Sequence, residues 1–219
     1  MADPKIAAML QADGRYEQAI LPDLEAYVEK QLSDGVYDLD ANLATLKLYL
    51  LHPDTSKVEV VEGILLKALM AFPKTDFSLC MYQIPEAHHT ALKDVIKVAQ
   101  QLEMCKFKAF WKDAEGEDVV KVLNRAKGWQ ASVRKFICGV VTSTYRSISR
   151  SSLADLLNVK SEGLKEFLEA NKWTASKDDK ETIIVNSASF KSAHTEKKSG
   201  PQVMSLDQYR SLFTASTSA

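Results

Sequence analysis

The stretch from Trp129 to Val185 constrains the fold of this chain more than any other. It begins with a stripe of apolar and aromatic residues at helical spacing, and two shorter apolar groups follow, separated by a turn. The stripe consists of Val133, Phe136, Ile137, Val140, Val141, Thr144, Tyr145 and Ile148. The two shorter groups are Leu153, Leu156 and Leu157, then Leu164, Phe167 and Leu168. This rhythm predicts a long helix followed by a helix-turn-helix.

Two short segments beyond these helices predict a pair of strands. Residues 173–176 and 182–185 flank the polar loop KDDKE, which suits a small hairpin or wing. Three helices followed by a wing are the sequence outline of a winged-helix domain. We expect strands in this chain only at about residues 173–185.

The third predicted helix of this block is acidic. Residues 161–170 carry Glu162, Glu166 and Glu169 against Lys165 alone, a net charge of −2. In a winged-helix protein that reads DNA, this helix enters the major groove, where the phosphates would repel the carboxylates. We therefore expect that this helix does not read nucleic acid.

Basic residues elsewhere leave a nucleic-acid contact open. The net charge of −1 divides into −5 for residues 1–128 and +4 for residues 129–219. The candidate nucleic-acid contacts are Arg134, Lys135, Arg146 and Arg150. A basic excess spread this widely is more often a solvated surface than a binding patch.

Residues 15–128 show helical patterns without strand alternation. Short apolar stripes are interrupted by proline and glycine, as where Pro22 and Gly35 bound the first of them. Stacked helical pairs fit this pattern, although no repeat has a fixed period. We expect a mainly α fold in which residues 1–128 form an array of stacked helical pairs, like a HEAT or tetratricopeptide array. Residues 129–185 are expected to form the winged-helix domain with its small β-wing, and residues 186–219 a linker and a short helix.

The composition changes near the C-terminus. Residues 186–202 are rich in Ser, Ala, His and Lys, which predicts a mobile linker. A short helix with a capping box is expected at Ser205–Phe213, with an apolar face formed by Leu206, Tyr209 and Phe213. Since so short a helix is marginal in water, we expect it either to bind a partner or to fold back onto its own domain.

The cysteines and the N-terminus bear on the compartment. Cys80, Cys105 and Cys138 each lie among apolar residues, which predicts buried free thiols in a reducing compartment. The N-terminal residues contain acids and no apolar run of signal-peptide length, and no segment approaches the ~20 apolar residues of a membrane span. We expect the protein to be cytoplasmic, with the nucleus as the alternative location.

No residue pattern indicates an enzyme, a cofactor site or a metal site. The glycines form no phosphate-binding loop. The spacing among the cysteines and histidines, including His88 and His89, matches no usual zinc pattern. One aromatic group at helical spacing favours a core position over a ligand-binding one: Phe107, Phe110 and Trp111.

Four strings of residues carry a resemblance to a known family. They are YDLDANLATLKLYLLHP (Tyr37–Pro53), ILLKALMAFPKTDFSLC (Ile64–Cys80), KFKAFW (Lys106–Trp111) and SVRKFIC (Ser132–Cys138). Over roughly residues 15–185 the chain resembles the k-subunit family of eukaryotic translation initiation factor 3, whose members are PCI-domain proteins.

This resemblance implies a HEAT-like helical domain joined to a winged helix, without catalytic residues. It implies a non-catalytic scaffold in a multi-subunit factor that binds the small ribosomal subunit, and close pairing with the factor's l subunit. The alternative is a free-standing winged-helix nucleic-acid binder, whose affinity would depend steeply on salt.

A partner surface is expected at the wing. Since the last strand belongs to a very small sheet, we expect one of its edges to be unpaired, and such edges are covered or used for pairing. PCI subunits, which this chain resembles, assemble side by side through their winged helices. The expected partner contacts here are Trp173, Thr182, Ile183, Ile184 and Val185. The alternative is that Trp173, Ile183 and Val185 cover the core of their own domain.

Overall fold

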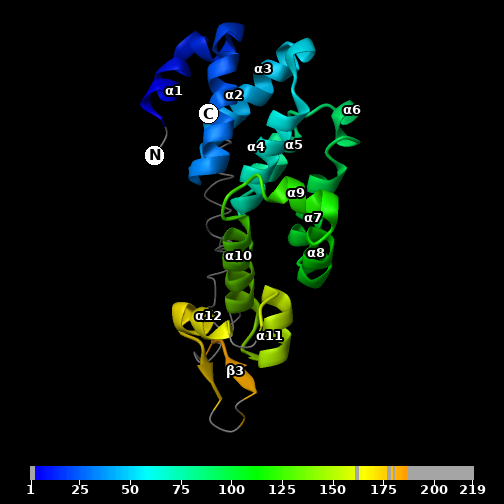
Figure 1. Ribbon diagram of the computed structural model, residues 1–219. Helices are drawn as coiled ribbons and strands as arrows, with labels where there is room; N and C mark the ends of the chain where they lie inside the picture. Colours follow the sequence, from blue (N-terminus) through cyan, green and yellow to red (C-terminus); the bar gives the residue numbers. More distant parts are fainter. Residues whose placement is uncertain (1–2, 161–162, 177–178, 180, 187–219) are drawn as a thin grey trace, which may run out of the picture. The chain divides into compact units, whose positions relative to one another are not determined.

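Helices make up most of the described chain, and short strands between residues 147 and 184 form a small antiparallel sheet (Figure 1). The computed structural model describes residues 3–160, 163–176, 179 and 181–186. The first nine helices are α1 (Pro4–Met9), α2 (Leu21–Asp34), α3 (Leu39–Leu51), α4 (Val58–Met70), α5 (Asp76–Met81), α6 (Glu86–His89), α7 (Lys93–Glu103), α8 (Phe107–Ala114) and α9 (Glu117–Leu123). Then come α10 (Trp129–Thr144), β1 (Ser147–Ser149), α11 (Arg150–Leu157), α12 (Leu164–Asn171), β2 (Thr174–Ala175) and β3 (Thr182–Ile184). Short 3-10 helices cover Ala12–Tyr16, Gln18–Ile20 and Pro53–Thr55.

Residues 15–128, all of which are described, contain helices and turns and no strand, as the sequence predicted. Pro22 lies in the first turn of α2, where its missing N–H costs nothing, and Gly35 ends the helix with a φ of 72°. The carboxylate of Asp38 then caps α3 by accepting a hydrogen bond from the Ala41 N–H at 3.2 Å. The expected bounds of α2 are therefore confirmed.

A buried amide pair joins α2 to α3. Gln31 Nε2 donates to Asn42 Oδ1 at 2.8 Å, and Gln31 Oε1 accepts from the backbone N–H of Asp38 at 2.9 Å. Both amide side chains are fully buried. Because an unsatisfied buried amide is costly, this pairing favours one alignment of the two helices.

Helices α2 and α4 approach closely at Gly63. A Cβ atom at this position would lie 2.9 Å from Leu32 Cδ1 and 3.3 Å from Val28 Cγ1. Glycine at position 63 therefore allows the close contact between α2 and α4.

Further along α4, Lys67 is almost fully buried in the last turn of the helix, and this burial lowers the pKa of its amine.

Aromatic residues link α8 to the start of α10. The ring centroids of Phe110 and Trp111 lie 5.1 Å apart, and Trp129 lies 6.3 Å from Phe110 and 6.0 Å from Trp111. Phe107, Phe110 and Trp111 are all buried, which confirms their predicted place in the core.

The cysteines do not all follow their prediction. Cys80 and Cys138 are buried, but Cys105 is exposed, so the expectation of three buried thiols is wrong for Cys105. It lies in the turn between α7 and α8, where its φ of 55° is left-handed and its side chain is exposed. Apolar neighbours in the sequence did not reveal this turn.

One hydrophobic core continues on both sides of residue 128. It includes Leu32 and Leu123 before this point and Val133, Leu153 and Ile183 after it. The Lys127 N–H also donates to the carbonyl of Leu32 at 3.0 Å. The domain boundary at residue 128 stays a prediction.

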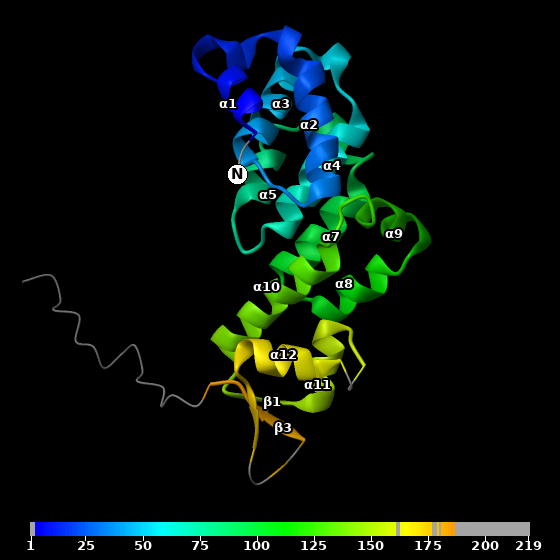
Figure 2. The ribbon, with the colours of Figure 1, turned by 60° about the vertical axis from the view of Figure 1, so that its left-hand side comes forward.

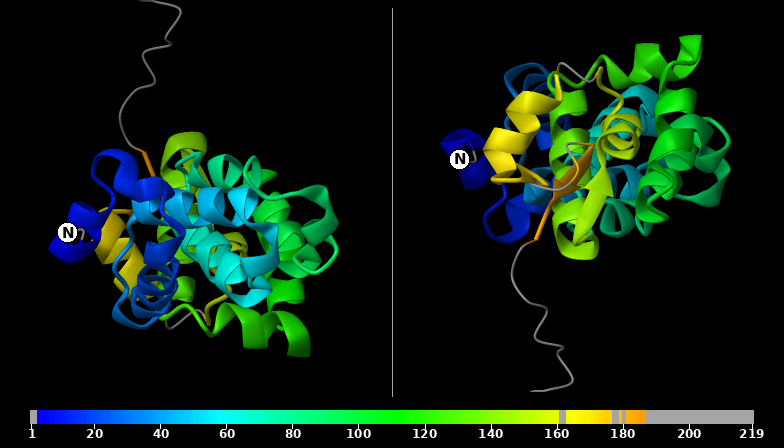
Figure 3. Two further views of the ribbon diagram at one scale, coloured as in Figure 1. Left: turned by 90° about the horizontal axis from the view of Figure 1, so that it is seen from above. Right: turned by 90° about the horizontal axis from the view of Figure 1, so that it is seen from below.

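The sheet contains a strand that the sequence did not predict. β3 pairs antiparallel with β1, with Ile148 opposite Ile183, and with β2, with Ala175 opposite Ile183. Figure 2 shows β1 beside β3, and the right-hand view of Figure 3, seen from below, looks onto this end of the described chain, with α12 in yellow. The expectation that strands occur only at 173–185 is therefore wrong. α10 ends at Thr144, and Ile148 belongs to β1 instead of the helical stripe.

Candidate interaction surface

The order of the strands determines which sheet edges are free. The order is β1–β3–β2, so β3 is the central strand and is hydrogen-bonded on both sides. The prediction that residues 182–185 leave an edge unpaired is therefore wrong. It failed because β1 was not recognised: Ser147, Ile148 and Ser149 offer one apolar residue among polar neighbours, too little alternation to predict a strand. The outer edges of the described sheet belong to β1 and β2.

The expected partner contacts in the sheet divide into two groups. Trp173 is 4% exposed and Ile183 is 0% exposed, so both contribute to the chain's own core, as the alternative interpretation proposed. The indole N–H of Trp173 has no hydrogen-bond partner among the described residues. Thr182, Ile184 and Val185 are half-buried.

Thr182 also takes part in the turn before β3. Its hydroxyl donates to Asp179 Oδ2 at 2.8 Å, and the Glu181 N–H donates to Asp179 Oδ1 at 2.9 Å. The Glu181 N–H and the Thr182 hydroxyl stabilise the carboxylate and lower the pKa of Asp179. Thr182 is thus engaged within its own chain, and Val185 packs against the chain's own core, as the alternative interpretation proposed.

The other three expected partner contacts are Leu206, Tyr209 and Phe213. They lie outside the described residues, as do the linker at 186–202, apart from Asn186, and the helix expected at Ser205–Phe213. These expectations stay predictions.

Arg134, the first candidate nucleic-acid contact, is engaged within the chain. Its Nε donates to the carbonyl of Leu157 at 3.0 Å, and its Nη2 donates to the carbonyl of Asn158 at 3.3 Å. Its guanidinium lies 5.2 Å from the ring centre of Trp111, whose own Nε1 donates to the carbonyl of Leu156 at 2.8 Å. Partial burial lowers the pKa of Arg134. This arginine therefore joins α8, α10 and the C-terminal end of α11.

The other three candidate cations have different surroundings. Lys135 is exposed on α10, Arg146 is exposed beyond its end, and Arg150 is half-buried at the first position of α11. Backbone atoms of Arg146 and Arg150 join the sheet region: the Val185 N–H donates to the carbonyl of Arg146 at 3.0 Å, and the Arg150 N–H donates to the carbonyl of Glu181 at 2.8 Å. Since Arg134 is already bound, the four do not form one free basic patch.

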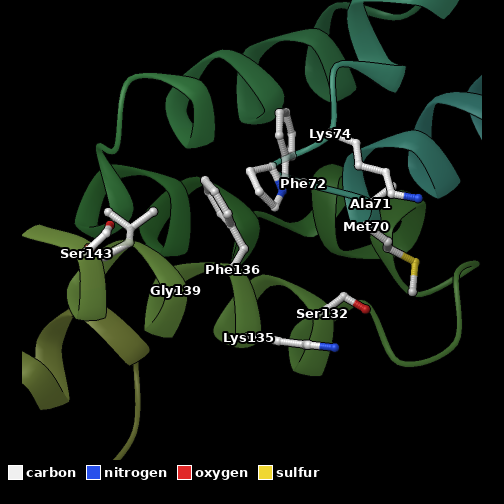
Figure 4. Close-up of a pocket in the computed structure, with 11 residues that line it drawn as sticks. Met70, Ala71, Phe72, Lys74, Ser132, Lys135, Phe136, Gly139 and Ser143 are labelled. Carbon is white, nitrogen blue, oxygen red and sulfur yellow. The ribbon is translucent and has the colours of Figure 1, made fainter. Parts of the chain in front are cut away.

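A groove along α10 is a candidate surface that the sequence did not predict. We call it the α10 groove; it has a volume of about 590 Å³ and lies between α10 and the segment that joins α4 to α5 (Figure 4). Its lining consists of Met70–Lys74 together with Ser132, Lys135, Phe136, Gly139, Val140 and Ser143. The α10 groove is lined mainly by apolar atoms and is open to solvent.

Two phenylalanines form the base of the α10 groove. The ring centroids of Phe72 and Phe136 lie 5.5 Å apart, and each packs on a further ring, with Phe77 6.3 Å from Phe72 and Phe107 6.0 Å from Phe136. Phe72 and Phe136 are half-buried, whereas Phe77 and Phe107 belong to the core. The groove is therefore supported from below by packed aromatic side chains.

The width of the apolar stripe on α10 is the sequence signal for this groove. Val133, Ile137 and Val141 follow one line at four-residue spacing and are buried. Phe136 and Val140 follow a neighbouring line one position earlier and are only half-buried. When the apolar face of a helix is wider than its contact with the core, the remaining apolar residues indicate a second contact surface on the same helix.

The described residues contain neither a candidate metal cluster nor a candidate membrane span. No group of three His, Cys, Asp or Glu side chains in this part of the chain could hold a metal ion. Among the same residues, no helix is both long enough and apolar enough to cross a membrane.

The chain is similar to known proteins over most of its length. A family model described as the CSN8/PSMD8/EIF3K family matches residues 55–194. A human protein named eukaryotic translation initiation factor 3 subunit K is 38% identical over 189 residues, which cover 85% of this chain and 86% of the relative. Proteins of the same name are 38% identical in Xenopus tropicalis, covering 80% and 81% of the two chains, and 38% identical in Aedes aegypti, covering 88% and 87%.

Proposed function

This chain belongs to the CSN8/PSMD8/EIF3K family, and from that premise we propose that it is a subunit of eukaryotic translation initiation factor 3. Its role is non-catalytic. It holds other subunits through protein–protein contacts while the initiation complex assembles on the small ribosomal subunit, and it does so in the cytoplasm.

The extent of the similarity is the observation that carries this proposal. The match to the family begins before α4 and continues past β3, so it includes the α10 groove and the whole sheet. The alignment with the human relative covers most of both chains, at 85% and 86%. Likeness over most of a chain supports a shared place in an assembly more strongly than a single matching motif would.

The proposed architecture is a HEAT-like array followed by a winged helix. The packing of α2 on both α3 and α4 supports stacked helices in the first part. In the second part, the order helix, strand, helix, helix and strand pair, from α10 to β3, supports a winged helix.

The l subunit of the factor is the proposed neighbour, and the proposed contact uses the outer strands of the sheet. Ser147 and Ser149 in β1 and both residues of β2 are exposed. Since the outer edges of these strands are unpaired within the described sheet, a strand from a partner could add to either one.

Co-purification tests the proposed function. The full chain carries an affinity tag in eukaryotic cells, the retained proteins are identified by mass spectrometry, and the extract is separated on a sucrose gradient. We expect the subunits of initiation factor 3, with the l subunit among them, and co-sedimentation with the small ribosomal subunit. A tagged chain that runs free of these subunits would contradict the proposal.

A salt titration tests the other class of function. We expect weak binding of the free chain to duplex DNA or RNA, with a shallow dependence on salt, because Arg134 is engaged within the chain. Tight binding that weakens steeply with salt would instead support a free-standing nucleic-acid binder.

A further inference from the structure

The α10 groove has the length and lining of a site for a helix. It follows α10 from Ser132 to Ser143, which is about three helical turns, or roughly 17 Å at the usual rise. A helix of similar length would place side chains at positions i, i+3 or i+4, and i+7 along it. Phe72 and Phe136 provide an apolar base against which such side chains can pack (Figure 4).

The backbone of the groove favours a helix over an extended peptide. One wall is a continuous helix, α10, whose own hydrogen bonds already use its backbone groups along most of this length. An extended peptide would bring unpaired N–H and carbonyl groups to an apolar surface, which is costly. A helix satisfies these groups internally and presents only side chains.

Gly139 provides an independent indication of close contact. A Cβ atom built at this position would meet nothing within 4 Å, so packing within the described chain does not require glycine here. Glycine in the middle of a helix is nevertheless unfavourable relative to alanine. A second helix that crosses α10 at this point supplies a reason, because the missing Cβ lets the two backbones approach.

The charged residues that line the groove indicate which charge a bound helix should carry on its flanks. Lys74 and Lys135 are the charged residues of the lining, one from each wall, and the lining contains no carboxylate. Neither lysine makes an ion pair with any described residue. In Figure 4 both amines lie toward the Met70 end of the groove, away from Ser143. Acidic residues on both flanks of a bound helix would be attracted to these amines.

We propose that the α10 groove binds an amphipathic helix with an apolar face and acidic flanks, supplied by another subunit. That the supplier is a subunit of initiation factor 3 rests on the proposed function. The chemistry of the bound helix rests on the groove itself. The chain's own segment Ser205–Phe213 matches this chemistry less well, because its Asp207 and Arg210 cancel in charge.

The first experiment measures binding to the isolated full chain. The probe is a fluorescent synthetic helix with Leu and Phe on one face and Glu on both flanks, and the matched probe carries Lys in place of Glu. We expect the Glu probe to bind about tenfold more tightly or better, a preference that Lys135→Glu should reduce or reverse. Equal binding of the two probes, or no binding of either, would overturn the proposal.

Substitutions on α10 separate loss of the site from loss of the fold. Gly139→Gln fills the open space in the groove, and Ala131→Gln is the matched control on an exposed position of the same helix outside the groove. We expect Gly139→Gln to melt no lower than the wild type, because glycine is the poorer helix former, and to bind the Glu probe about tenfold more weakly. Unchanged binding by Gly139→Gln would overturn the proposal. Ala131→Gln should bind like the wild type.

The second experiment measures the assembled factor and keeps the two proposals distinguishable. If the groove is occupied by another subunit, Lys74 and Lys135 should become protected from acetylation on assembly, and Gly139→Gln should be retained about tenfold less well. If the wild type assembles but its groove lysines stay reactive, the groove proposal fails while the proposed function stands. If the chain never enters the factor but binds the Glu probe, the proposed function and the identity of the supplier fail, while the helix-binding chemistry stands.

Two other occupants are outcomes that would contradict the proposal. If truncation after Gln202 strengthens probe binding about tenfold, the chain's own C-terminal segment occupies the groove. If the wild type dimerises in sedimentation and Gly139→Gln is monomeric, a second copy of the chain is the occupant.

Discussion

Replacing Arg134 with alanine should destabilise the fold, since this side chain holds three elements together. The variant loses a charged hydrogen bond to the Leu157 carbonyl at 3.0 Å and a longer one to the Asn158 carbonyl at 3.3 Å. It also loses the contact with Trp111, whose ring centre lies 5.2 Å from the guanidinium. Both carbonyls lie at the C-terminal end of α11, where a positive charge is favourable.

The expected loss follows from these contacts. The shorter bond contributes about 1.5 kcal/mol, the longer and more exposed one about 0.5 kcal/mol, and the cation–π contact about 0.5 kcal/mol. The free energy of unfolding should therefore fall by about 2–3 kcal/mol, which lowers Tm by about 5–10 °C for a protein of this size. Arg134→Lys keeps a charge near Trp111 but loses the forked donor, so about half of the loss is expected.

Urea unfolding followed by tryptophan fluorescence measures this loss as a lower midpoint at an unchanged slope. The control is Lys135→Ala, the next residue on α10, which makes no ion pair with a described residue and should change the free energy of unfolding by less than about 0.5 kcal/mol. If Arg134→Ala unfolds like the wild type and instead weakens nucleic-acid binding with a smaller salt slope, the structural role is wrong. Arg134 would then be the phosphate contact that the sequence alone allowed.

Three further predictions concern thiols, packing and charge. Burial raises the pKa of Cys80 to about 12 and that of Cys138 to about 11, so Ellman's reagent should modify only the exposed Cys105 in the native chain; rapid reaction of a second thiol would contradict this. Gly63→Ala should lower the free energy of unfolding by about 1–3 kcal/mol in urea, because its Cβ would overlap a side chain of α2; an unchanged midpoint would show that the helices separate freely. Glu166→Lys should not weaken binding to RNA or DNA in a filter assay, because this carboxylate repels phosphates. Weaker binding would contradict the expectation that α12 does not read nucleic acid.

The helical part of the fold was predictable because its signals are local. Pro22 and Gly35 bound α2 as their backbone preferences require. Phe110 is in the core, as its helical spacing suggested. Each of these features depends on residues within a few positions of one another, and such residues are read directly from the sequence.

The remaining features depend on contacts between distant residues. Ile148 becomes part of a strand because it pairs with Ile183, and the sequence around Ile148 alone does not predict this. Arg134 looked like a solvated cation, but its partners lie at the end of another helix. The α10 groove likewise arises where the segment around Phe72 meets Phe136, two residues that are adjacent only in the folded chain.

The central position of β3 determines when the sheet can form during synthesis. The strand lies at the end of the described chain, yet it is the only described strand that pairs with both others. A nascent chain that has released α1–α9 from the ribosome can already form their short-range contacts, whereas β1 must wait for β3. Until then the core that includes Leu153 and Leu164 lacks Ile183. A premature stop codon shortly before Thr182 would therefore release a chain with ordered helices, an incomplete sheet and exposed apolar residues that favour aggregation.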